Sequence, residues 1–317
     1  MITEEEFLAK VDEMITPEDK NKYATTRKKM ITRVFTWIPL EILACVLIFR
    51  VWGVQPITIV FGILIFFITV MMIVQSAKIQ WDNLKSKYIH QIFKFILEGY
   101  KFKYEPNQFI SKDIFKKTAY DCEFDEYHGE DLLKINIPND DGTPSNVELQ
   151  ISDLLLKRID KASEGKTIQI SFGKNHAKME EDVVTVFKGV LGYIEFPFEF
   201  TCGLALNKSI DGLNKINLED VQFNKNFKTY TNNQLESLRI LTPTMMEKLK
   251  NLYKWAEKLE MVFTKNKLYF KFPNNIFELN VKGKKFNSNV FLPVYHDLYN
   301  IVYLVEEVKN NNRIFKM

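Results

Sequence analysis

The stretch LLKINIPNDDGTPSNVELQIS, residues 132–152, predicts the fold of much of this chain. On either side of a polar centre, apolar and polar residues alternate as they do in half-buried strands. The centre contains Asp141-Gly142, a pair that suits the tight turn between two antiparallel strands. The stretch therefore predicts a β-hairpin.

Similar patterns continue toward the C-terminus. Three more segments have the composition of strands: KTIQISF, VVTVFKGVLGYIEFPFEF and TCGLALN. The segment LEMVF–TKN–KLYFKF predicts a second hairpin, and YHDLYNIVYLVEEVKN predicts a closing helix. Between them, Thr242–Glu260 has helical periodicity, and Thr244 with Glu247 fits a capping box. Strands grouped apart from helices indicate an α+β domain over residues 103–317, mostly antiparallel β with a few packed helices.

Upstream of this domain lies ITIVFGILIFFITVMMIV, Ile57–Val74, eighteen residues without a charge. Thirteen of them are Leu, Ile, Phe or Val. On an insertion scale they contribute about −4 to −8 kcal/mol. This length and composition predict a transmembrane helix.

A second apolar segment, Val34–Trp52, contains an acidic residue, Glu41. A carboxylate at the centre of a span costs about 2.5–3.5 kcal/mol, so insertion of this segment alone is near marginal. The turn residues GVQP at 53–56 allow both segments to insert together as a helical hairpin over residues 31–76. Glu41 would then either face the neighbouring helix, as an intramembrane polar site, or lie near the headgroups.

Basic residues flank the hairpin on both sides, whereas the connecting turn carries only Arg50. By the positive-inside rule this distribution places both termini in the cytoplasm. The flanking residues are Arg27, Lys28, Lys29, Arg33, Lys78, Lys85 and Lys87.

Helical periodicity continues on both sides of the hairpin. Residues 1–30 predict cytoplasmic amphipathic helices, with Phe7, Val11 and Ile15 on one stripe and Thr16 as the N-cap of the next helix. Residues 77–102 predict a helical stalk that ends near Gly99.

Composition excludes several classes of function. The net charge of +3 is spread evenly, without the basic patch that nucleic-acid binding requires. Cys45, Cys122 and Cys202 are far apart and form no metal-binding motif. No nucleophile motif of a hydrolase occurs, and no cofactor is expected.

Three segments resemble a family of bacterial membrane proteins of unknown function, domain of unknown function 3137. They are YHGEDLL (Tyr127–Leu133), VFKGVLGYIEF (Val186–Phe196) and VQFNKNFKTYTNNQLESLRILTPTMMEKL (Val221–Leu249). Lys134 and Ile135 stand where the family pattern has a glycine. The resemblance implies a fold and a location in a bacterial cytoplasmic (inner) membrane, and it assigns no catalytic residue.

The acidic segment DCEFDEYHGED, residues 121–131, is the first candidate site. Six carboxylates lie around His128 in the sequence, and the candidate metal ligands or acid/base groups are Asp125, His128, Glu130 and Asp131. The spacing does not match an EF-hand, and an acidic surface that blocks sheet pairing is the alternative.

The second candidate, a binding site, is the polar stretch TYTNNQLESLRILTP. Asn232, Asn233, Gln234, Glu236 and Arg239 converge near a turn. The alternative is structural, with an asparagine as helix N-cap and Glu236 paired to Arg239 on the helix surface.

These observations favour a non-enzymatic function: a membrane-anchored cytoplasmic binding or scaffolding module. Its expected partners are the lipid bilayer and an unidentified protein at the membrane, with a homo-oligomer through the hairpin as a further option. The alternative is a membrane-tethered metal-dependent hydrolase that uses the acidic segment. A third hypothesis is a small transport or sensing unit that depends on Glu41.

Overall fold

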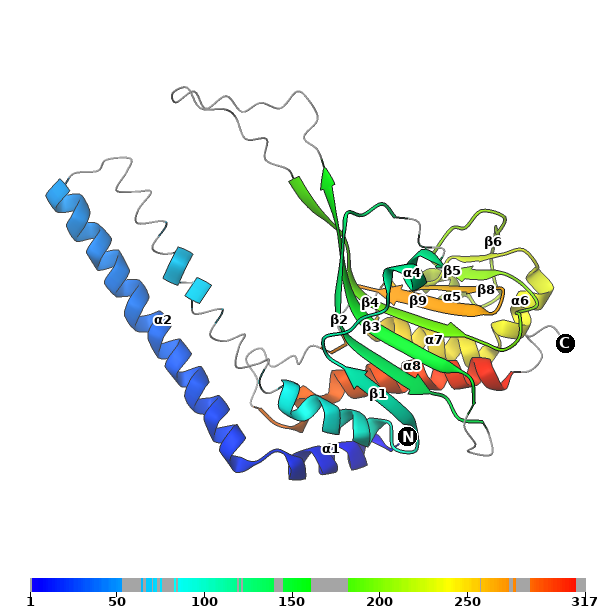
Figure 1. Ribbon diagram of the computed structural model, residues 1–317, viewed down its shortest axis with the longest axis horizontal. Helices are drawn as coiled ribbons and strands as arrows, with labels where there is room; N and C mark the ends of the chain where they lie inside the picture. The colour runs from blue at the N-terminus through cyan, green and yellow to red at the C-terminus, as the bar shows by residue number, and fades with distance from the viewer. Residues whose placement is uncertain are drawn as a thin grey trace, which may run out of the picture. The chain divides into compact units, whose positions relative to one another are not determined.

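The structure of the protein is a computed structural model (Figure 1). The structure describes residues 2–52, 64, 67–69, 71–72, 75, 83, 85–118, 120, 122–139, 145–160, 182–256, 258–273, 276–277 and 286–311. The chain divides into two compact units. The first comprises Met1–Glu98 with Glu278–Tyr295, and the second comprises Gly99–Phe277 with His296–Met317.

The first unit begins with helix α1 (Glu4–Met14). Thr3 caps it, since its hydroxyl accepts a hydrogen bond from the Glu6 backbone while the Glu6 carboxylate accepts one from the Thr3 backbone. Phe7 and Val11 are fully buried, as the apolar stripe predicts. Phe7 stacks on Tyr295 with ring centroids 4.8 Å apart, so α1 is fixed to the C-terminal part of this unit. The short 3-10 helix η1 (Ser288–Val290) precedes α8 (Leu292–Asn310) there.

Helix α2 (Pro17–Trp52) follows without an interruption at Pro39. Thr16 is its N-cap as predicted, because its hydroxyl accepts a 3.2 Å hydrogen bond from the Asp19 backbone. Within the described part of the chain, no helix has both the length and the apolar character needed to cross a membrane. Most of 57–74, the predicted turn at 53–56, and most side chains of 34–52 including Glu41 lie outside that description.

Asp19 joins α2 to the helical residues 85–96 of the same unit. Its carboxylate pairs with Lys87 at 2.5 Å and accepts hydrogen bonds from Tyr88 and from Thr16, the latter at 2.7 Å. Burial alone would raise the pKa of Asp19, but these hydrogen bonds and the Lys87 charge outweigh burial and lower the pKa to about 2.

Asp19→Asn is therefore expected to destabilise the protein by about 1–2 kcal/mol at neutral pH, after allowance for solvent screening. Because the folded-state pKa is depressed from 3.8, this stabilisation is present above pH 4 and disappears as the pH falls toward 2. Urea unfolding in detergent at pH 7 and pH 3 measures both effects. The control is Glu98→Gln, which removes the exposed ion pair of Lys10 with Glu98 and should change little. An equal loss at both pH values would contradict the linkage.

Among the described residues, the second unit contains a nine-stranded antiparallel sheet with the order β1-β2-β3-β4-β9-β8-β5-β7-β6 (Figure 1). Its long strands are β2 (Glu126–Asn136), β3 (Glu148–Asp160) and β4 (Asp182–Glu195). The shorter ones are β1 (Lys101–Glu105), β5 (Leu204–Leu206), β6 (Asn214–Ile216), β7 (Thr229–Thr231), β8 (Glu260–Thr264) and β9 (Lys267–Phe272).

Both predicted hairpins are confirmed. β2 pairs with β3 so that Asn136 lies opposite Glu148, and β8 pairs with β9 so that Thr264 lies opposite Lys267. The turn at Asp141-Gly142 and the predicted strand KTIQISF lie outside the described residues.

The helices of this unit are α4 (Lys112–Lys116), α5 (Val221–Asn226), α6 (Gln234–Ile240), α7 (Pro243–Trp255) and the later part of α8. The predicted capping box at Thr244 was wrong. Thr242 is the N-cap, because its hydroxyl accepts a 3.1 Å hydrogen bond from Met245 and Pro243 occupies the first helical position. The helix also ends before the predicted Glu260, since that residue opens β8.

Candidate functional site

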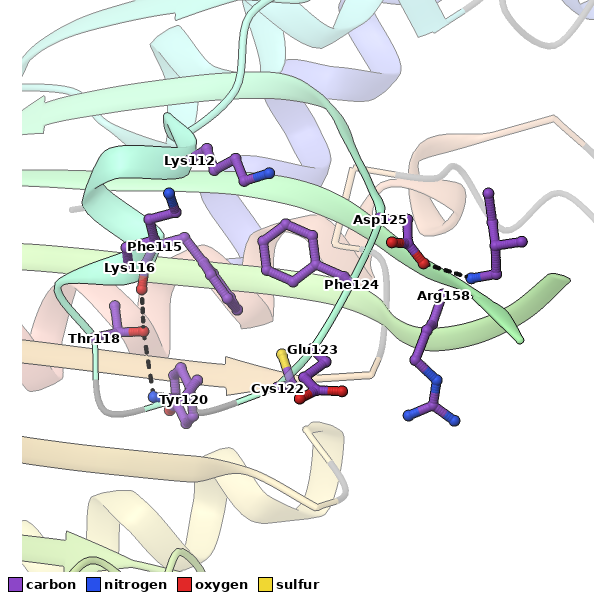
Figure 2. Close-up of a pocket in the computed structure, with 11 residues that line it drawn as sticks. Lys112, Phe115, Lys116, Thr118, Tyr120, Cys122, Glu123, Phe124, Asp125 and Arg158 are labelled. Carbon is purple, nitrogen blue, oxygen red and sulfur yellow. Dashed lines mark hydrogen bonds between the residues drawn. The ribbon is translucent and has the colours of Figure 1, made fainter. Parts of the chain in front are cut away.

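A surface cavity of about 790 Å³ lies in the second unit, beside α4 (Figure 2). Three parts of the chain line it: α4 itself, the connection from Thr118 to Asp125, and the end of β3. Figure 2 shows Lys112 and Lys116 on the α4 side and Arg158 on the far side of the connection.

Local hydrogen bonds explain why α4 stops at the edge of the cavity. Ser111 caps its start by accepting a 3.3 Å hydrogen bond from the Ile114 backbone. After the helix, the Thr118 hydroxyl donates to the Phe115 carbonyl at 2.6 Å and accepts from the Tyr120 backbone at 3.4 Å. Thr118 thereby turns the chain away from the helix and into the connection that lines the cavity.

Asp125 holds the other end of the connection against β3. Its backbone donates a 2.9 Å hydrogen bond to the Lys157 carbonyl, and its carboxylate accepts a 2.7 Å hydrogen bond from the Ile159 backbone (Figure 2). The side chain thus extends the strand pairing by one position. The Asp125 carboxylate is therefore engaged by a backbone N–H group of its own chain.

Aromatic rings form the apolar part of the lining. Phe115 and Phe124 meet edge to face with centroids 5.6 Å apart, and the Lys112 ammonium lies 4.8 Å from the centre of the Phe124 ring. Tyr120 is buried below and donates a 3.1 Å hydrogen bond to the Glu260 carbonyl.

The polar lining has both signs of charge and one thiol. Lys112, Lys116 and Arg158 are its basic residues, Glu123 and Asp125 are its acidic residues, and the half-buried Cys122 contributes the thiol. Such a lining can bind a ligand that has an apolar part for the rings and charged groups for the rim.

The residues of the first predicted site lie in different surroundings in the structure. Asp125 lines the cavity, whereas His128 and Glu130 are exposed on β2 and Asp131 is buried. In the described residues, no group of three or more His, Cys, Asp or Glu side chains is arranged to hold a metal ion.

Two acidic residues of β2, Glu126 and Asp131, interact with neighbouring side chains. Lys157 pairs with Glu126 at 3.0 Å and, by hydrogen bond and charge, lowers the pKa of that carboxyl, while the His128 ring lies 3.5 Å from the same group. Asp131 has a left-handed backbone (φ 63°) where β2 shifts register against β3, and it accepts a hydrogen bond from Tyr104. Burial, with the Asp131 charge, raises the pKa of Tyr104.

The second predicted site is held together by structural hydrogen bonds. Asn233 caps α6 by accepting a 3.3 Å hydrogen bond from the Glu236 backbone, and Asn232 accepts a 3.0 Å hydrogen bond from Gly203. Glu236 and Arg239 form the predicted ion pair at 3.1 Å, and Gln234 is exposed at the start of the helix.

The sequence did not point to most of the cavity. Its lysines belong to a five-residue helix, and nothing in the local pattern shows that they line the same cavity as the distant Arg158. It also missed Asp297 in α8, where burial raises the pKa of the carboxyl to about 7. A lone aspartate in an apolar helical pattern was the available signal.

Comparison with known proteins confirms the family resemblance over part of the chain. The family model described as Protein of unknown function (DUF3137) matches residues 185–310. Of the three segments that carry the resemblance, the second and third fall in this range. No curated protein matches the chain. Among solved structures, the mycobacterial trehalose monomycolate transport factor A, TtfA, is similar at 10% identity and a TM-score of 0.29, covering 67% of this chain and 92% of that one.

Proposed function

We propose that this protein is a binding or scaffolding module anchored in a bacterial cytoplasmic membrane. In this proposal the hairpin of residues 31–76 spans the bilayer, both termini are cytoplasmic, and a protein partner at the membrane is recognised by the second unit.

The observation that carries the proposal is the exposure of large apolar side chains in the first unit. On α2, Phe35, Leu40 and Leu43 are 75%, 63% and 59% exposed. Exposed apolar residues recur between positions 64 and 72: Leu64, Phe67, Ile68, Met71 and Met72. Proteins surrounded by water rarely expose so many large apolar side chains together, whereas lipid is a suitable solvent for them.

The distribution of charge on α2 supports the proposed orientation, in which both termini are cytoplasmic. Lys20, Lys22, Lys28 and Lys29 are exposed on the first half of α2, before the apolar residues begin. Basic residues at the cytoplasmic end of a span, attracted by anionic lipids, favour this topology. The binding part of the proposal rests on the cavity of the second unit, whose lining combines aromatic rings with charged side chains.

Membrane extraction tests the anchor. The full chain is expected to remain in the membrane pellet at alkaline pH, because its apolar segments are in lipid. Leu64→Lys with Ile68→Lys should release a large fraction, since each central lysine costs about 2.5–3.5 kcal/mol. Ser209→Lys, at an exposed position of the second unit, is the control and should stay in the pellet. Release of the unaltered chain would overturn the anchor.

A reporter fused after Met317 tests the orientation. One that works only in the cytoplasm should be active, and one that works only outside should be silent. The reverse pattern would overturn the proposed cytoplasmic location of the second unit.

A further inference from the structure

Two lysines of α4 concentrate positive charge at the cavity beside this helix. Lys112 and Lys116 both line the cavity and are four residues apart, so they lie on the same side of α4 with Cβ atoms about 5–6 Å apart. Two like charges at this spacing destabilise a helix. An anion bound between the two ammonium groups would remove that repulsion.

The acidic residues of the cavity do not neutralise this pair. In the part of the chain that the structure describes, neither Lys112 nor Lys116 forms an ion pair with a carboxylate. The Asp125 carboxylate instead accepts its hydrogen bond from the Ile159 backbone, and Glu123 is exposed on the connection (Figure 2). The described lining has three basic and two acidic side chains, which leaves a net charge of +1 in favour of an anion.

An aromatic wall lies directly beside the lysine pair. The Lys112 ammonium is 4.8 Å from the centre of the half-buried Phe124 ring, and Phe124 packs on Phe115. The cavity volume of about 790 Å³ falls within the range of about 300–1,000 Å³ that is usual for sites of small organic ligands. An inorganic anion would fill a small part of this space and leave the rings in contact with water. The lining therefore fits an anion that also has an apolar part.

We propose that the cavity binds a small organic anion in which a phosphate or carboxylate group is attached to an apolar ring. Lys112 and Lys116 bind the anionic group through charge-assisted hydrogen bonds, and the apolar ring packs against Phe124. This inference rests on the binding role proposed for the cavity and names the class of ligand. It does not depend on the membrane anchor.

Phenyl phosphate, which joins one ring to one phosphate group, is the probe for this site. A ligand that binds only the folded chain raises its Tm in proportion to occupancy, so a titration gives an apparent Kd. Thermal unfolding of the full chain in non-ionic detergent, at constant ionic strength, measures this shift. The apparent Kd for phenyl phosphate should be at least about tenfold below that for inorganic phosphate, because only the former places a ring against Phe124.

Substitution of the lysine pair tests the position of the anionic group. Lys112→Gln combined with Lys116→Gln should abolish the shift caused by phenyl phosphate. Lys117→Gln combined with Lys225→Gln is the matched control, because it removes the same charge from exposed positions outside the cavity lining, and it should keep the shift.

Three results would each overturn the proposal: no shift with phenyl phosphate, an equal affinity for inorganic phosphate, or the same response in both double variants. The anchor is tested separately by membrane extraction. A failure of the cavity to bind the probe therefore leaves the anchor standing, and release of the chain from the membrane leaves the cavity assignment standing.

Discussion

Gly192→Ala is expected to cost about 3 kcal/mol of folding free energy, a severe loss for a substitution that adds one methyl group. Gly192 lies directly opposite Phe270 across the pairing of β4 with β9. A Cβ on Gly192 would be 2.0 Å from the Phe270 ring, far inside any normal contact. The ring cannot move aside easily, because it is 1% exposed and lies parallel to Phe272 with centroids 6.3 Å apart.

Urea unfolding of the full chain measures this loss. Phe270→Leu should rescue Gly192→Ala in part, so the double variant should be more stable than the sum of the two single effects implies. Gly203→Ala is the matched control, because its nearest neighbour would be the flexible end of Leu213 at 3.1 Å. If Gly192→Ala is no less stable than Gly203→Ala, the close packing of Phe270 on Gly192 is contradicted.

Asp297→Asn is expected to stabilise the protein by about 2–4 kcal/mol at pH 8 and to change little at pH 4. Burial raises the pKa of Asp297 from 3.8 to about 7, so the folded protein must ionise a desolvated carboxyl at high pH. A raised folded-state pKa makes the contribution of Asp297 most favourable below pH 4. That contribution is lost as the pH rises toward 7 and stays lost above it. The neutral amide has no such dependence.

Denaturant unfolding of the full chain between pH 4 and pH 8 measures the difference between variant and wild type. Asp113→Asn, at an exposed position of α4, is the control and should follow the wild type at each pH. A difference that is constant across this range would mean that Asp297 does not titrate with a raised pKa.

Local patterns predicted several elements correctly because their signals are local. The apolar stripe of α1 is buried at Phe7 and Val11, and Thr16 caps α2. The hairpin of β8 with β9 turns at two residues, Lys265 and Asn266. Each depends on residues only a few positions apart. The error at α7 has a similar origin: Thr242 and Thr244 both suit an N-cap, and the proline between them decides in favour of Thr242.

The candidate site was predictable only in fragments. Asp125 was singled out as a carboxylate in an acidic segment, but its role depends on the Ile159 backbone, 34 residues away. Asn233 and the pair of Glu236 with Arg239 were predictable as alternatives, since both interactions span three residues.

By itself, the sequence determined the class of this protein: an N-terminal region of long apolar segments, followed by antiparallel strands with a few helices. Periodicity, turn residues and caps act within about a dozen residues. Because apolar side chains are buried on folding, their spacing in the sequence predicts which face of each element is buried. Only the tertiary structure decided that β9 lies beside β4, that Gly192 must accommodate Phe270, and that Lys112 shares a cavity with Arg158. These contacts join residues far apart in the chain, and their choice depends on which surfaces fit together once all strands have formed.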